Sequence, residues 1–190
     1  MSNILILYAT VEGQTARIAE RIAQTLRDNG HRAETHPATR DGPGLEPAIY
    51  DAVIVGASIH YGRHPGYLRS WVRDCRGALD ARPNAFFSVS LSGGGPGAKP
   101  EAAQRYLDKF LRQARWNPGQ TATFAGALQF SKYGAFKRLL MVLIVGLAGG
   151  DTDTSKDYEY TDWNAVGRFA ETFALRLGSP RANASVETLQ

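Results

Sequence analysis

The sequence predicts an α/β fold in which one five-stranded parallel sheet is covered by helices on both faces. Three observations lead to this prediction: short apolar runs, segments between them with apolar residues at helical spacing, and a length of 190 residues, which suits one domain. Strands buried on both faces read as continuous apolar runs. Strands that alternate with helices form right-handed crossovers, and five of them favour the doubly wound order 2-1-3-4-5.

Each element is predicted from its own pattern. Apolar runs predict strands at Ile4–Tyr8, Ala52–Ala57, Ala85–Leu91 and Thr121–Ala127, and a short strand is expected around Arg32–His36. Apolar residues at helical spacing predict helices at Arg17–Asn29, Pro65–Leu79, Pro100–Arg115 and Asp162–Leu177. Gly30 ends the first helix. Because ligands of such sheets bind outside the carboxyl ends of the strands, the loops after the first, third and fourth strands are the candidates for a binding site.

Composition narrows the class of protein. The chain has 22 Lys and Arg against 18 Asp and Glu, a formal net charge of +4, which is typical of a solvated surface with a mild preference for anionic partners. The one cysteine, Cys75, excludes a disulfide framework and a thiolate metal cluster. Met1–Asn3 lack the basic start of a signal peptide. We therefore expect a cytoplasmic protein.

The loop after the first strand has the composition of an anion site. Thr10-Val11-Glu12-Gly13-Gln14-Thr15 has hydroxyl groups at both ends, a glycine that permits a tight turn, and a helix N-terminus directly after it. The loop has no lysine, and the chain has neither a GxxxxGK[ST] nor a GxGxxG motif, so a phosphate monoester fits better than a triphosphate or a dinucleotide. The alternative is ordinary N-capping of the helix by Thr10 or Thr15.

This loop resembles the T-x-x-G-x-T phosphate loop of flavodoxins. Over about residues 3–177 the chain resembles, more specifically, the flavodoxin-like, quinone-dependent protoporphyrinogen IX oxidases of bacterial haem synthesis. The matching stretches are Gly56–Gly62, Ala125–Leu128, Gly149–Thr154 and Tyr160–Trp163, together with a long insertion before the last helix. The glycine-rich loop Ser92–Gly97 departs from that family, in which we expect basic or bulky residues there.

The resemblance implies a flavodoxin-like doubly wound domain over residues 1–177, with an insertion at 129–160 and with FMN as cofactor. Two loops of this fold face the isoalloxazine ring, and the end of the insertion is expected to fold back toward it. The cofactor-binding residues are then Thr10, Val11, Glu12, Gly13, Gln14, Thr15, Ser58, Ile59, His60, Tyr61, Gly62, Ser88, Val89, Ser90, Leu91, Ser92, Thr152, Asp153 and Thr154.

The same resemblance implies the reaction. Protoporphyrinogen IX is oxidised to protoporphyrin IX in three two-electron steps, and the electrons pass through FMN to menaquinone or ubiquinone. The flavin carries the hydride chemistry, and the protein supplies position and electrostatics. The catalytic residues, including the general base, are not identified.

Other functions are weighed against this one. An electron-carrier flavodoxin is typically acidic, and the net charge of +4 and the insertion argue against it; an FMN-dependent quinone reductase stays open. A phospho-acceptor receiver domain needs an acidic cluster where this chain has Tyr8-Ala9-Thr10. Ser58 lacks the second glycine of a nucleophile elbow, which argues against a hydrolase.

Several residues are given ordinary structural roles. His60 and His64 are expected on a loop without a third ligand, so no metal site is predicted. Tyr61 either stacks on the flavin or fills its loop. Basic residues on the second helix read as a solvated face; they are Arg63, Arg69, Arg73 and Arg76.

The insertion contains a segment that suits a membrane surface. Leu139–Ala148 is uncharged and, at ten residues, too short to cross a bilayer, and Lys132, Lys137 and Arg138 precede it. We expect these three cations to meet the substrate or anionic lipid, with the protein held peripherally on the inner face of the cell membrane. A buried helix or a dimer interface is the alternative. No nucleic-acid partner is expected, the oligomeric state is left open, and residues 178–190 are expected to be disordered.

Overall fold

The computed structural model describes residues 1–40, 44–132, 142, 146, 149 and 151–178. Five parallel strands form one sheet in the order β2-β1-β3-β4-β5, which confirms the predicted order. The strands are β1 (Asn3–Ala9), β2 (Arg32–Pro37), β3 (Ala52–Ser58), β4 (Asn84–Ser90) and β5 (Gln120–Ala125). All neighbouring pairs are parallel, so the carboxyl ends of all five strands meet at one edge.

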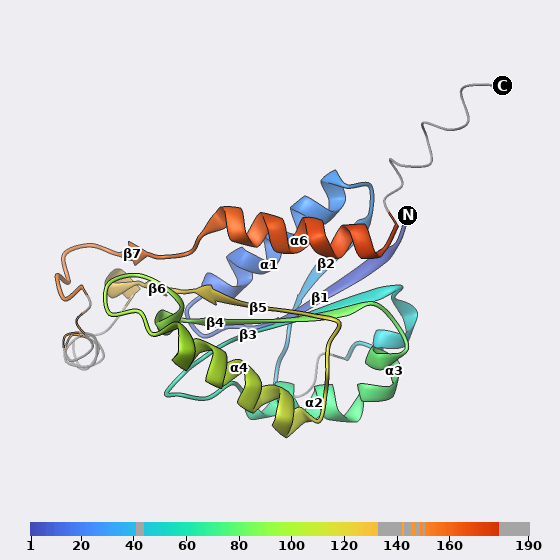
Figure 1. The fold of residues 1–190 in the computed structure, drawn as a ribbon, viewed down its shortest axis with the longest axis horizontal. Coiled ribbons are helices and arrows are strands. Elements are labelled where there is room, and N and C mark those ends of the chain that lie inside the picture. Colours follow the sequence, from blue (N-terminus) through green and yellow to red (C-terminus); the bar gives the residue numbers. More distant parts are fainter. Residues whose placement is uncertain (41–43, 133–141, 143–145, 147–148, 150, 179–190) are drawn as a thin grey trace.

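Helices cover both faces of this sheet (Figure 1). One face carries α1 (Gln14–Asp28) and α6 (Trp163–Arg176), and the other carries α2 (Gly66–Asp74), α3 (Arg76–Asp80) and α4 (Pro100–Ala114). Successive side chains of β1 point to opposite faces: Ile4 and Ile6 join the core under α1 and α6, whereas Leu5 and Leu7 join the core under α2 to α4. Burial on both faces is the reason that β1, β3 and β4 read as nearly continuous apolar runs, whereas the edge strand β2 is polar and largely exposed.

Two predicted elements differ from the structure. The helix predicted at Pro65–Leu79 is interrupted at Cys75, whose φ of −91° and ψ of 6° lie outside the helical region, so that α2 ends and α3 begins there. The strand predicted at Thr121–Ala127 ends at Ala125. Gly126 interrupts it by donating its N–H to Ser90 and accepting from the N–H of Tyr160, and the chain then leaves the sheet.

The insertion is closed at its base. β6 (Ala127–Leu128) pairs antiparallel with β7 (Tyr158–Glu159). Next to them, the 3-10 turns η2 (Leu91–Gly93) and η3 (Phe130–Lys132) enclose a small apolar cluster of Leu128, Phe130 and Leu91 with Tyr158 and Tyr160. Figure 1 shows β6 and β7 beyond the ends of β4 and β5. The two ends of the insertion therefore lie together at the carboxyl edge of the sheet.

A third 3-10 turn, η1 (Pro47–Ile49), precedes β3.

Several sequence predictions fall outside the described residues. These are Lys137, Arg138, most of Leu139–Ala148, and the tail from residue 179 onward. Lys132 is the last residue of η3. Within the described part of the chain, no helix has both the length and the apolar character needed to cross a bilayer.

Candidate functional site

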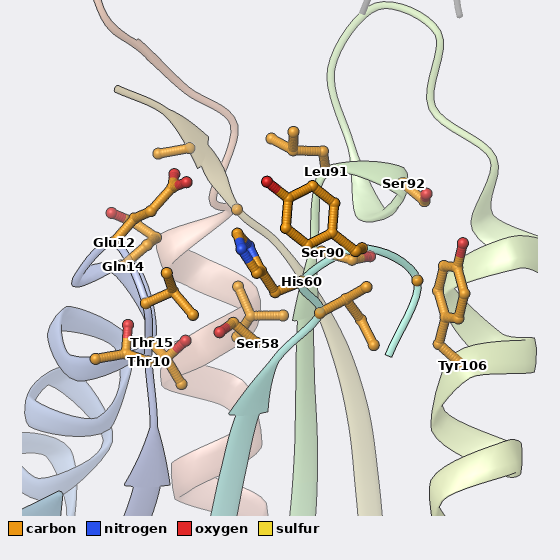
Figure 2. A pocket seen from close by; sticks show the side chains of 17 residues that line it. Thr10, Glu12, Gln14, Thr15, Ser58, His60, Ser90, Leu91, Ser92 and Tyr106 are labelled. Atoms are coloured by element: carbon orange, nitrogen blue, oxygen red, sulfur yellow. The ribbon is translucent and has the colours of Figure 1, made fainter. Parts of the chain in front are cut away.

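A cavity of about 250 Å³ lies at the carboxyl edge of the sheet, between the loops that follow β1, β3 and β4. Figure 2 shows Thr10 and Thr15 at one end of it and Tyr106 at the other, with Ser58 and His60 between them. The predicted site residues that line this cavity are Thr10, Val11, Glu12, Gln14, Thr15, Ser58, Ile59, His60, Tyr61, Gly62, Val89, Ser90, Leu91 and Ser92.

The loop after β1 is shaped by Gly13. This residue has a φ of 95°, in the left-handed region that favours glycine, and its N–H donates to Thr10 Oγ1 over 2.9 Å. No side chain caps α1, which differs from the capping alternative for Thr10 and Thr15. The amide groups of the first turn have no partners within the helix and carry its partial positive charge. This end of the cavity can therefore bind an anion.

Two buried hydroxyl groups of the cavity are without hydrogen-bond partners. Thr15 Oγ1, at the start of α1, and Ser58 Oγ, at the end of β3, are both inaccessible to solvent and make no hydrogen bond within the described part of the protein. An unsatisfied buried polar group costs about 1–3 kcal/mol. Both residues line the cavity, so a ligand with a phosphate and polar ring atoms would satisfy groups that the fold leaves unpaired.

Gln14 joins this loop to the end of the insertion. Its Nε2 donates to Glu159 Oε1 over 2.9 Å and to Thr161 Oγ1 over 2.8 Å, and Arg17 pairs with Glu159 over 3.0 Å. Burial would raise the pKa of Glu159, but the hydrogen bonds from Gln14 and Arg17 and the charge of Arg17 outweigh it, and the pKa is lowered. β7 is thus held against the phosphate loop by an ionised carboxylate.

The loop after β3 makes a tight turn. The backbones of His60 and Arg63 exchange two hydrogen bonds of 2.9 and 3.2 Å, and Tyr61 and Gly62 have φ angles of 48° and 72°. A type I′ turn requires positive φ at both central residues, which a tyrosine rarely adopts. Tyr61 is 71% exposed, and its ring centroid lies 4.2 Å from that of His60. The turn presents both rings to the cavity.

Close contacts explain why the loop after β4 contains glycines. A Cβ atom at Gly93 would lie 2.8 Å from the backbone oxygen of Phe124, and one at Gly95 would lie 2.6 Å from the ring of Tyr160. Only glycine permits so close an approach to β5 and to the end of the insertion. Basic or bulky residues, as expected from the family pattern, therefore do not fit at Gly93 or Gly95 on this path of the chain.

Other predicted residues do not line the cavity. Ser88 lies beneath it, where its Oγ is 2.9 Å from His64 Nε2. Thr152–Thr154 do not line the cavity either, and the Asp153 carboxylate accepts from the backbone N–H and the hydroxyl of Ser155. Their contact with the cofactor stays a prediction. Gly13 shapes the phosphate loop without lining the cavity.

Sequence reasoning missed four residues. Tyr106 on α4 closes the end of the cavity opposite the phosphate loop, and Gly126 and Ala127 line its rim. His64 supports the floor: its ring packs edge-on against Phe110 at a centroid distance of 5.0 Å, and burial lowers its pKa to about 4. Gly126 and Ala127 fall within a stretch already singled out by the resemblance, whereas no local pattern distinguishes Tyr106 or His64.

Comparison with known proteins agrees with this architecture. The sequence-family model described as flavodoxin domain matches residues 5–155. The protein named protoporphyrinogen IX dehydrogenase (quinone) from Escherichia coli (strain K12) is 37% identical over 177 residues, 93% of this chain and 97% of that protein. One of the same name from Leishmania major is 38% identical over 170 residues, 90% of this chain and 74% of that protein.

A solved structure supports the fold. Oxidised flavodoxin 1 from Bacillus cereus superimposes with a TM-score of 0.53 and 17% identity, covering 93% of this chain and 100% of the flavodoxin. At that identity the likeness concerns the fold alone. The chain belongs to the flavodoxin domain family, and within it to the family named protoporphyrinogen IX dehydrogenase (quinone), a membership that indicates a flavin cofactor.

Proposed function

We propose that the protein oxidises protoporphyrinogen IX to protoporphyrin IX, with FMN as its cofactor and a membrane quinone as its electron acceptor. Two relatives that match at least 90% of the chain carry a name that states this substrate and acceptor. The observation that carries the proposal is the pair of buried, unpartnered hydroxyl groups of Thr15 and Ser58, two residues that line a cavity at the carboxyl edge of the sheet.

FMN suits the two ends of this cavity better than FAD. Thr10, Thr15 and the first-turn amides of α1 would hold the phosphate monoester, and no glycine-rich dinucleotide motif is present for a pyrophosphate. Ser58 would donate to or accept from a polar edge of the ring system. Bound FMN supplies a two-electron acceptor, which the protein's own side chains do not provide.

The chain's own side chains would position the substrate and take up protons. Ile59, Leu91 and Ala127 give the cavity apolar walls that exclude water. Each two-electron step also releases protons from the porphyrinogen. Glu12 and His60 line the cavity and carry a carboxylate oxygen and an imidazole nitrogen that can accept them. Over three steps the porphyrinogen loses six electrons and six protons, and three quinone molecules become quinols.

Membrane contact is proposed for the insertion. Its base is closed by β6 and β7 beside the cavity, so the chain between them leaves and returns at the same edge of the sheet as the cavity. Lys132, Lys137 and Arg138 precede the apolar run Leu139–Ala148, and each basic residue near anionic lipid contributes about 1 kcal/mol. The proposed location is the cytoplasmic face of the cell membrane.

Vesicle binding tests this location. Reversing the three charges should reduce partitioning onto vesicles that contain phosphatidylglycerol and make it less sensitive to salt. Equal binding by the parent protein and the triple variant would contradict the electrostatic part of the proposal.

Turnover assays test the function as a whole. Purified protein loaded with FMN should convert protoporphyrinogen IX to fluorescent protoporphyrin IX under anaerobic conditions when menaquinone or ubiquinone is present. Heat-released cofactor should migrate as FMN; migration as FAD would overturn the cofactor assignment. If the flavin passes electrons from NADH to a quinone and porphyrinogen is not oxidised, the result would favour a quinone reductase. Electron exchange with a redox protein alone would favour an electron carrier.

A further inference from the structure

A second hollow, of about 410 Å³, adjoins the cavity. It lies between the loop after β3 and helix α4, and it shares Gly62 and Tyr106 with the cavity. Figure 2 places Tyr106 at the end of the cavity opposite Thr10 and Thr15. The hollow therefore adjoins the end of the cavity that is remote from the phosphate loop.

Three cations line this hollow: Arg63, Arg69 and Lys109. Its lining contains no carboxylate, and within the described residues none of the three lies within salt-bridge distance of one. Arg69 Nη1 donates to the neutral amide oxygen of Gln113 over 2.6 Å. We call this hollow, with Arg63, Arg69 and Lys109 in its lining, the cationic hollow.

The neighbouring basic residues behave differently. Arg73 pairs with Asp74 over 3.6 Å, and Arg76 pairs with Asp80 over 3.8 Å. The prediction that all the arginines of this region form one solvated face holds for Arg73 and Arg76, which are exposed and paired. Arg63 is also exposed and Arg69 is half-buried, but both line the concave surface of the hollow rather than pairing with a carboxylate of the described residues.

The floor of the hollow adds no charge. His64 lies there beside Phe110, and burial lowers its pKa to about 4, so that the imidazole is neutral at pH 7. The aromatic floor and the ring of Tyr106 suit a flat apolar body, and the cationic rim suits carboxylates attached to it. Arginine offers parallel donors that match a carboxylate in two-point contact.

We propose that the cationic hollow binds the propionate carboxylates of the tetrapyrrole substrate. The inference rests on the proposed function, because it takes protoporphyrinogen IX as the substrate. Arg63 is the central residue, since the His60–Arg63 turn fixes its backbone directly beside the cavity. Lys109 and Arg69 provide the remaining charge from α4 and α2.

Binding of the stable product tests the inference without turnover. Protoporphyrin IX and its dimethyl ester are titrated into FMN-loaded protein, and binding is followed by porphyrin fluorescence. The double reversal Arg63→Glu with Lys109→Glu should weaken binding of the acid about tenfold, because two attractive contacts become repulsive. Binding of the dimethyl ester should not change. The matched control is Arg112→Glu, also on α4 but lining a different hollow beside Trp116, which should leave both affinities unchanged.

The outcomes separate the two proposals. Equal affinity of the parent protein for acid and ester, or an unchanged affinity of the double variant for the acid, would overturn the role of the cationic hollow. Porphyrinogen oxidation with an unchanged KM in the double variant would do the same while leaving the proposed function intact. A parent protein that holds FMN and never oxidises porphyrinogen would refute the proposed function itself, whatever the binding data.

Discussion

At one end of the cavity the ligand-facing groups come from one short stretch, Thr10–Thr15, whereas at the other end the Ser58–Gly62 loop meets Tyr106, which lies far along the chain on α4. The first end depends on backbone geometry: a left-handed glycine and a helix N-terminus without a side-chain cap. The second depends on packing between distant elements. A substitution at the first end should therefore change ligand binding without changing the rest of the fold. A substitution at the second end should also change the packing of the elements that meet there.

The second end rests on a buried polar pair. His64 Nε2 lies 2.9 Å from Ser88 Oγ, and the imidazole packs against Phe86 and Phe110 with centroid distances of 5.7 and 5.0 Å. These contacts support the turn from below. The described residues at the phosphate end include no buried histidine, so acid should affect the two ends differently.

The largest effect is expected for His64 and concerns stability against pH. Its pKa is about 4 in the folded protein and 6.5 in an unfolded chain, so the unfolded state binds the proton more readily. The free energy of unfolding therefore has its full value, as far as His64 is concerned, above about pH 7. It decreases as the pH falls from 6.5 toward 4, by on the order of 3 kcal/mol. His64→Gln, which is never charged and keeps a partner for Ser88, should remove this dependence in urea unfolding.

The control for His64 is His36→Gln, because His36 is half-exposed near Glu34. This variant should keep the acid sensitivity of the parent protein. His31, whose pKa burial also lowers, retains its own share in both variants. Identical stability curves for the parent and His64→Gln between pH 7 and 4 would contradict the account of this end of the cavity.

The next effect concerns the phosphate end and cofactor affinity. Thr15→Val removes the unpartnered hydroxyl and keeps the side-chain shape. A hydrogen bond to a charged group contributes about 1.5–3 kcal/mol, so the Kd for FMN should rise about 10- to 100-fold. The apoprotein should be at least as stable as the parent. Thr25→Val is the control, because Thr25 lies on the same helix and donates to the Arg21 carbonyl; unchanged FMN affinity in Thr15→Val would refute the phosphate assignment.

A smaller effect is expected where the insertion meets the phosphate loop. Gln14→Leu deletes the hydrogen bonds to Glu159 and Thr161, which should cost about 1 kcal/mol locally. Amide hydrogen exchange at Tyr158–Tyr160 should accelerate about fivefold, since this segment would open more often. Gln24→Leu on the same helix, which loses only an exposed bond to Asp28, should change nothing there. Equal protection of Tyr158–Tyr160 in both variants would show that Gln14 does not hold β7.

The smallest effect concerns the strained turn. Tyr61→Gly relieves a left-handed tyrosine and should stabilise the protein by up to about 1 kcal/mol, while porphyrinogen turnover falls through loss of the exposed ring. Arg115→Gly is matched to it, because Arg115 has a φ of 54° at the end of α4. That variant should gain stability and keep full turnover. A Tyr61→Gly protein with unchanged turnover would leave Tyr61 with a structural role only.

The contrast between the two ends also explains what the sequence could predict. β1, β3 and β4 follow from apolar runs that are buried on both faces, and the strand order follows from the alternation of strands with helices. The phosphate loop is contiguous, so it too is visible in the sequence. Tyr106 is not, because which residues of a helix reach a neighbouring loop depends on how the helix packs. His64 and Ser88 read as separate polar residues until the fold brings them to 2.9 Å. The exit of the chain at Gly126 likewise depends on a contact between distant elements, since the Gly126 carbonyl accepts from the N–H of Tyr160. The break at Cys75 is a local change of the backbone, to a φ of −91° and a ψ of 6°.

The central claim, that the cavity uses a flavin to oxidise a porphyrinogen, is tested most directly by an anaerobic half-reaction. FMN-loaded protein is mixed with protoporphyrinogen IX without quinone, and the visible flavin absorbance is recorded. The account predicts that the absorbance bleaches as porphyrin appears, at one porphyrin for every three flavins reduced, and that it returns when menaquinone or ubiquinone is added. A flavin that stays oxidised in the presence of excess porphyrinogen would contradict the account.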